Sequence, residues 1–131
     1  MTAGIQALFK SIGEDGCYAL CIIELGRRGR LDRDCVDIIE QAIQMKALRQ
    51  DMFVLDPALL LSLAGGGQWT VRIESATYVP LSTEMSVEYW KYTASDGTVY
   101  GHFILPDWDS LGESNTRKYG KCVSKRIFTR A

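Results

Sequence analysis

The first part of the chain carries apolar residues at helical spacing. A helix is predicted over residues 3–11, and Gly13 is expected to end it. Residues 17–25 are apolar on nearly every side, which is typical of a buried helix. This second helix is expected to begin at Cys17 and to stop at Gly26.

Two further helices are predicted before a run of glycines. The first follows a capping residue at Asp32 or Asp34 and has an apolar face made of Val36, Ile39, Ile43 and Ala47. The second begins at Asp56-Pro57, because aspartate caps helices and proline suits their first turn, and it extends through Leu63. The glycines at 65–67 are expected to end it.

After these glycines the hydrophobic period changes to two. Segments rich in β-branched and aromatic residues predict strands over 68–75, 85–93, 98–105 and 122–128. Ser95-Asp96-Gly97 indicates a hairpin between two of them. Helices followed by antiparallel strands predict an α+β fold, with the helices on one face of a meandering sheet. We expect one domain over 1–131, with a helical part of about 1–64 and a sheet part of about 68–129.

Composition excludes several classes of protein. With 131 residues, 47% of them hydrophobic and 24% charged, the chain is neither disordered nor fibrous. A net charge of −1 lacks the basic footprint of many nucleic-acid binders, so no nucleic-acid partner is expected. No apolar run is long enough to cross a bilayer, and no signal peptide is visible, so we expect no membrane association and a cytoplasmic location. The four cysteines are then expected to be free thiols.

One of these thiols stands out by its position. Cys17 follows Gly16 at the expected start of the buried helix, where unpaired N–H groups and the helix dipole favour a thiolate. The alternative is that Cys17 is a small buried hydrophobic residue. Cys21, one turn later among apolar neighbours, is interpreted as an inert core thiol.

The only histidine, His102, lies on a predicted strand. A thiol and an imidazole are the partners needed for thiol-dependent acyl transfer, and a third group is needed to orient the ring. Asp109 is the first candidate for that group and Asp107 the second. The alternative is that His102 is a half-buried strand residue with a structural hydrogen bond.

A metal site is the competing use of the same residues. Cys17, Cys21 and His102, together with Cys35 or Cys122, could supply four zinc ligands, but their spacings match no common zinc motif. Gly65-Gly66-Gly67 is followed by no lysine and therefore does not resemble a phosphate-binding loop. We expect neither a metal nor another cofactor.

Several short motifs, taken in order, resemble papain-like cysteine peptidases. They are Gly-Cys-Tyr-Ala-Leu-Cys from residue 16, Gly-His-Phe-Ile-Leu from residue 101, Trp-Asp-Ser-Leu-Gly from residue 108 and a closing Lys-Tyr-Gly-Lys from residue 118. The chain looks most similar to small phage- and prophage-encoded members, with a layout similar to bacteriocin-processing (double-glycine) peptidases. The resemblance implies a helical half that carries the nucleophile and a sheet that carries the histidine and the acid.

Carried over residue by residue, the resemblance makes Cys17 the nucleophile, His102 the general base and Asp109 the orienting acid. It also calls for an oxyanion site, for which the Cys17 backbone N–H and Gln6 are the candidates. Papain-like enzymes usually carry a glutamine a few residues before the nucleophile, where this chain has Glu14 and Asp15.

Two functions remain open at this point. The first is a thiol hydrolase that cleaves an amide in a peptide or in the peptide stem of a cell wall, which a phage could deliver. The second is a catalytically inactive binding or inhibitory module that acts on a host protein. Its anchors would be exposed aromatic residues, although packing within the sheet is the favoured interpretation for them: Tyr89, Trp90, Tyr92 and Trp108. The oligomeric state is not predicted.

Overall fold

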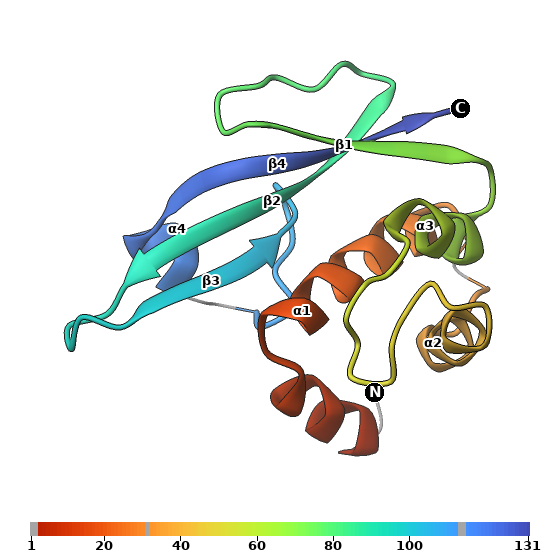
Figure 1. Ribbon diagram of the computed structural model, residues 1–131, viewed down its shortest axis with the longest axis horizontal. Helices are drawn as coiled ribbons and strands as arrows, with labels where there is room; N and C mark the ends of the chain where they lie inside the picture. The colour runs from red at the N-terminus through yellow and green to blue at the C-terminus, as the bar shows by residue number, and fades with distance from the viewer. Residues whose placement is uncertain (1–2, 31, 113–114) are drawn as a thin grey trace.

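The computed structural model describes the backbone of residues 3–30, 32–112 and 115–131, and the side chains of residues 16–30, 32–112 and 116–131. Helices from the first half of the chain pack against an antiparallel sheet from the second half (Figure 1). The fold is therefore α+β, as predicted.

One long helix opens the chain where two were expected. The helix α1 (Ala3–Arg28) continues through Gly13 and Gly16, so the predicted helix end at Gly13 and the predicted helix start at Cys17 are both wrong. Glycine costs a helix about 1 kcal/mol relative to alanine, which tertiary packing can outweigh. Figure 1 shows a sharp bend in α1 between its N-terminal turns and its long straight part, so the helix changes direction rather than ending.

The next two helices lie close to their predicted positions. The helix α2 (Cys35–Gln44) begins directly after Asp34, although the Asp34 side chain makes no capping hydrogen bond. The helix α3 (Pro57–Gly65) is capped as predicted, because an Asp56 carboxylate oxygen accepts the Leu59 N–H at 3.1 Å. After α3 the chain turns through Gly66 and Gly67, whose φ angles of 80° and 84° favour glycine.

All four predicted strands are present, with ends within two residues of the predicted ones. They are β1 (Trp69–Ser75), β2 (Glu84–Thr93), β3 (Val99–Ile104) and β4 (Lys121–Arg130). A short helix that was not predicted, α4 (Asn115–Tyr119), precedes the last strand. The hairpin between β2 and β3 is confirmed: Gly97 has a φ of 87°, and the Ala94 N–H donates to the Thr98 carbonyl at 2.8 Å.

The order of the strands differs from the predicted meander. It is β1-β4-β2-β3, with every pair antiparallel, so the last strand lies between the first two. The connection 76–83 is longer than the loop of a tight hairpin, which has about two to five residues. Its length leaves room for β4 to enter between β1 and β2. β4 is suited to this central place because Ile127 and Phe128 are both fully buried.

The main core lies between the helices and one face of the sheet. Phe128 and Val87 from the sheet join Ile22 of α1 and Leu60 of α3 in one buried cluster. Burial of side chains of this size contributes roughly 1.5–3 kcal/mol each. The helical and sheet parts therefore share one core.

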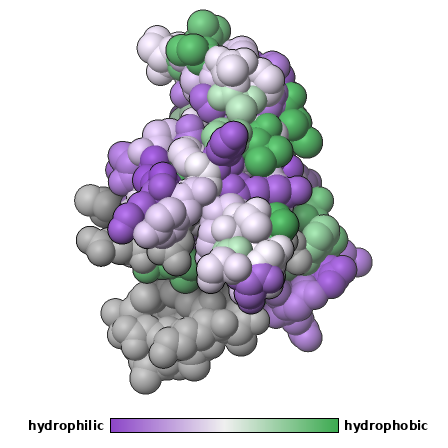
Figure 2. All heavy atoms as spheres, turned by 90° about the vertical axis from the view of Figure 1, so that its left-hand side faces the viewer, coloured by the Kyte–Doolittle hydropathy of each residue, from purple (hydrophilic) through white to green (hydrophobic). Residues whose placement is uncertain are grey.

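A polar cluster ties the connection 76–83 to the sheet. The Arg72 guanidinium contacts Glu74 and Glu84 at 2.8 Å each. One Glu84 oxygen also accepts the Tyr78 hydroxyl at 2.7 Å and the Leu81 N–H at 3.0 Å. Apolar side chains in this connection stay exposed, Val79 by 79% and Leu81 by 63%, and Figure 2 shows green surface at the corresponding top of the molecule.

Among the residues described, no helix is long and apolar enough to span a bilayer.

Gly26→Ala is expected to destabilise the fold. A Cβ at Gly26 would lie 2.4 Å from the Ala64 Cβ and 2.8 Å from the Gly65 nitrogen, so α1 and α3 would have to separate. Overpacking of this kind costs about 1–3 kcal/mol, which urea unfolding would measure. Gly29→Ala is the matched control, because its Cβ would meet only the Gly26 oxygen at 4.0 Å. Equal unfolding midpoints for both variants would contradict the close helix contact.

Glu84→Gln is expected to reduce the acid sensitivity of the fold. Hydrogen bonds from the Leu81 N–H, Tyr78 and Arg72 lower the pKa of Glu84 from 4.5 to about 2. A carboxyl group with a lowered pKa stabilises the fold above its unfolded pKa, and this contribution is lost as the pH falls toward the folded pKa. The free energy of unfolding of the natural protein should therefore drop between about pH 5 and pH 2, and by less in the variant. Glu40→Gln, at an exposed position on α2, should leave the profile unchanged.

Candidate active site

Three side chains from distant parts of the sequence form a continuous hydrogen-bonded chain. The Nδ1 atom of His102 lies 2.9 Å from the Cys17 Sγ, and its Nε2 atom lies 2.7 Å from Oδ1 of Asp109. An ionised carboxylate only accepts hydrogen bonds, so Nε2 carries a proton and Nδ1 faces the thiol. In the neutral pair, Nδ1 can then accept the thiol proton.

Contacts of neighbouring residues hold the thiol opposite the imidazole. Tyr18 and Phe103, which directly follow Cys17 and His102, stack with ring centroids 4.6 Å apart. One helical turn after Cys17, the Cys21 thiol donates to the Phe103 carbonyl at 3.4 Å. The edge strand β3 is thereby fixed along α1, and the register of this contact sets the distance between sulfur and ring.

A tight turn brings Asp109 back to the histidine. The Leu105 N–H donates to the Trp108 carbonyl at 2.8 Å, so the chain reverses immediately after β3. Pro106 is well suited to the second position of such a turn. Asp109 is then held by the Leu111 N–H, which donates to its Oδ1 at 2.9 Å. Only Trp108 pairs with the strand end, at Leu105, and residues 109–112 form no strand.

Asp107, the second candidate for the orienting acid, points away from the histidine. Its carboxylate pairs with the Arg28 guanidinium at 3.0 and 3.3 Å, and its side chain is 69% exposed. Asp109 is therefore the acid that the fold presents to His102, and Asp107 anchors the turn to the end of α1. The sequence pattern gives no signal for this use of Arg28, because the two residues lie 79 positions apart.

The comparisons with known proteins add one finding. A family model described as "Protein of unknown function, DUF261" matches residues 3–130. The chain belongs to this family. No curated protein and no solved structure matches it.

The site of this DUF261 chain is largely enclosed. Cys17 is 8% exposed and His102 is 4% exposed. A low local dielectric strengthens the interaction of the Asp109 charge with the imidazole. Burial therefore makes the arrangement of these three side chains more rigid and its electrostatics stronger than on an open surface.

The structure gives no support to the two predicted oxyanion donors, the Cys17 backbone N–H and Gln6. Cys17 lies inside α1 rather than at its start, and an N–H inside a helix is directed at the carbonyl four residues earlier. Gln6, with Glu14 and Asp15, belongs to the part of α1 whose side chains lie outside the described residues. The argument for a thiolate at a helix N-terminus therefore does not apply, and the imidazole is the group that would accept the thiol proton.

The other three thiols of this DUF261 chain are separate from the site chemistry. Burial raises the pKa of the Cys21 thiol well above its usual value and also raises the pKa of Cys35 and Cys122. Cys21 is fully buried, as its interpretation as a core thiol requires. Within the described part of the chain, no three histidine, cysteine or acidic residues are grouped so as to hold a metal ion.

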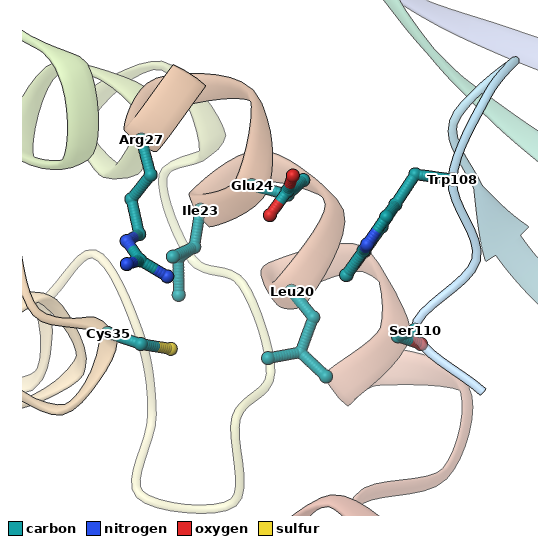
Figure 3. A pocket seen from close by; sticks show the side chains of 7 residues that line it. All are labelled: Leu20, Ile23, Glu24, Arg27, Cys35, Trp108 and Ser110. Atoms are coloured by element: carbon teal, nitrogen blue, oxygen red, sulfur yellow. The ribbon is translucent and has the colours of Figure 1, made fainter. Parts of the chain in front are cut away.

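A small apolar pocket lies beside the turn that carries Asp109. It measures about 150 Å³ and is drawn in Figure 3, lined by Leu20, Ile23, Glu24, Arg27, Cys35, Trp108 and Ser110. Trp108 and Ser110 flank Asp109 in sequence and face α1 across the pocket (Figure 3). The Ser110 hydroxyl is buried without a hydrogen-bond partner among the described residues.

The four aromatic residues considered as binding anchors are all half-buried. Tyr89 packs on Phe103 with ring centroids 4.6 Å apart, and Tyr92 stacks on Tyr100 at 5.2 Å. The Arg117 guanidinium lies over the Trp90 ring, and Trp108 packs against the main core. These contacts agree with packing of the aromatic residues against their neighbours.

Cys17 is expected to react with iodoacetamide at least about tenfold faster than the other three thiols at neutral pH. The raised pKa values of Cys21, Cys35 and Cys122 reduce their thiolate fraction about tenfold for each unit, whereas His102 can take the Cys17 proton. Mass spectrometry of digested, labelled protein measures the four rates. His102→Ala should slow only Cys17, and equal, slow labelling of all four thiols would refute an activated Cys17.

Proposed function

We propose that this protein is a thiol hydrolase that cleaves an amide bond through Cys17, His102 and Asp109. The observation that carries the proposal is the continuous chain from the sulfur through both ring nitrogens to a carboxylate, with links of 2.9 and 2.7 Å. Nucleophile, base and orienting group within hydrogen-bond reach of one another are the signature of nucleophilic catalysis.

The reaction would begin with transfer of the thiol proton to Nδ1 of His102. The resulting imidazolium donates from Nε2 to Asp109, whose charge stabilises it. The thiolate attacks the carbonyl carbon, and a C–S bond forms as the carbonyl electron pair moves to oxygen. When that pair returns, the C–N bond breaks, and the leaving amine takes the proton from Nδ1.

A thioester between the acyl group and Cys17 remains. Water attacks this thioester while Nδ1 takes its proton, and the C–S bond then breaks. The proton returns from the imidazolium to the sulfur, which restores the starting state. No external oxidant, reductant or metal enters the balance of these steps.

The resemblance to papain-like peptidases supports this assignment. The order of nucleophile, histidine and acid along the chain, with helices before strands, is the one the resemblance implies. By the same resemblance, the substrate would be a peptide or the peptide stem of a cell wall, and the protein would be of phage or prophage type.

One observation favours the alternative of an inactive binding or inhibitory module on a host protein. Cys17 is only 8% exposed, so a substrate has little access to its thiol. It also lies inside α1, so no helix N-terminus favours the thiolate. In such a module the same three side chains would be a buried polar network that fixes α1 against β3.

Substitutions at the site separate the two functions. Cys17→Ala should abolish acyl-enzyme formation with p-nitrophenyl acetate, and His102→Ala should slow it by about 10²–10⁴-fold, the usual contribution of a general base. Asp109→Asn should cost less, because the amide oxygen can still accept from Nε2–H. Stopped-flow release of nitrophenol together with intact-protein mass measures these effects.

Asp107→Asn is the matched control, because Asp107 lies on the same turn and pairs with Arg28 instead of His102. It should react at nearly the natural rate. Full activity of Cys17→Ala or His102→Ala would refute the hydrolase. The absence of any acyl-enzyme in the natural protein would support the inactive module.

A further inference from the structure

A second hollow lies on the sheet side of α1 and is lined by Tyr18, the residue that follows Cys17. Its volume is about 440 Å³, and its lining residues are Tyr18, Pro57, Val71, Arg72, Ile73 and Arg126. Proline, valine and isoleucine make much of the wall apolar. The polar groups in it are therefore few, and each can be accounted for.

Arg126 is a half-buried cation in this hollow. Its guanidinium lies over the Phe103 ring at 5.0 Å and the Tyr89 ring at 5.5 Å, and it donates one hydrogen bond to the Ser124 hydroxyl at 2.6 Å. Within the described residues it pairs with no carboxylate. Aromatic stacking holds the planar group in place while most of its five N–H donors stay available.

Arg72, the other cation in this hollow, does pair with carboxylates. Two carboxylates, Glu74 and Glu84, neutralise it at 2.8 Å each. As far as the described side chains go, Arg72 in this hollow is therefore neutralised by carboxylates and Arg126 is not. A partly desolvated guanidinium favours an anion, and a carboxylate fits its paired donors.

Tyr18 supplies a second donor in the same hollow. Its hydroxyl makes no hydrogen bond within the part of the chain that the structure describes. Burial raises the pKa of Tyr18 to about 12, against a smaller opposing effect of Arg126, so the hydroxyl stays protonated. A protonated hydroxyl and a guanidinium together match the two oxygens of a carboxylate.

Tyr18 connects the hollow to Cys17 along α1. Successive helical residues differ by about 100° around the axis, and their Cα atoms lie about 3.8 Å apart, so Tyr18 lies one step around α1 from Cys17. The Arg126 guanidinium lies over the ring of Phe103, which directly follows His102 and stacks on Tyr18. The stacked pair of Tyr18 and Phe103 therefore links the lining of the hollow to the elements that carry Cys17 and His102.

We infer that Arg126 and Tyr18 form a carboxylate-binding subsite that selects acidic substrates for Cys17. This inference rests on the proposed thiol hydrolase. The substrate class is an amide with a carboxylate close to the reacting carbonyl, present either as an acidic side chain or as a free main-chain carboxylate. Arg126 is a specificity residue and takes no part in the proton transfers.

Two pairs of peptidyl vinyl sulfones, which alkylate a reactive thiolate, test the subsite and its two carboxylate sources. One pair is N-acetyl-glutamyl-glycine vinyl sulfone and its glutamine counterpart. The other is γ-glutamyl-glycine vinyl sulfone, with a free α-carboxylate, and its α-amide. The readout is the ratio of the second-order rate constants of Cys17 alkylation for acid and amide, determined within each protein variant from intact mass.

In the natural protein the acid should react at least about tenfold faster than the amide in one of the two pairs, as loss of a hydrogen bond to a charged group predicts. Arg126→Gln should bring the ratio to about one, Arg126→Lys should keep part of it, and Tyr18→Phe should lower it partly. Because the ratio is taken within one variant, a purely structural role of Arg126 would not change it.

Arg130→Gln is the matched control. Arg130 lies on the same strand and its guanidinium lies over the Trp69 ring at 4.9 Å, but it is exposed and lines no part of this hollow. The ratio should survive this change. A ratio near one for both pairs in the natural protein, or a ratio unchanged by Arg126→Gln, refutes the subsite alone if iodoacetamide still labels Cys17 rapidly. If iodoacetamide does not label Cys17, the hydrolase and the subsite are both refuted.

Discussion

The contact between α1 and the edge strand β3 determines where the candidate site forms. Tyr18 stacks on Phe103, and the Cys21 thiol donates to the Phe103 carbonyl one turn further along. A shift of β3 by one residue would reverse the side to which each of its side chains points. These contacts therefore do more than add packing energy, since they select the single register in which Cys17 and His102 meet.

The acid is positioned by a second, independent device. The turn between Leu105 and Trp108 is closed by backbone hydrogen bonds, and outside it the exposed pair of Asp107 with Arg28 ties the turn to the end of α1. Exposed ion pairs contribute little to stability, about 0–1 kcal/mol. The backbone hydrogen bonds of the turn and the Leu111 N–H therefore position Asp109, and the pair with Arg28 accounts only for where the Asp107 carboxylate points.

Local sequence signals predicted the parts of the fold that depend on local chemistry. The Asp56 cap, the Asp96-Gly97 hairpin and the alternation in the strands are each determined by a few adjacent residues. The continuity of α1 and the insertion of β4 between β1 and β2 depend on packing across the whole chain, to which a local pattern is blind. The meeting of Cys17 and His102 was predicted from residue chemistry and family resemblance, whereas the burial of the site and the position of Arg126 over the Phe103 ring required coordinates.

The two hollows beside α1 give the site an asymmetry that its three polar residues alone would lack. Tyr18 and Leu20 lie about 200° apart around the helix axis when counted in the direction of the chain. Cys17 lies on the shorter arc of about 160° that joins them on the other side. The Leu20 side is smaller and mostly apolar, with the Asp109 turn as its wall, whereas the Tyr18 side is larger and contains the Arg126 cation. A substrate that crosses the thiol would therefore meet an apolar surface on one side and a positive charge on the other. For the proposed hydrolase, such a difference would fix the direction in which a chain binds, and thereby which flank of the amide, the acyl side or the amine side, lies toward Arg126.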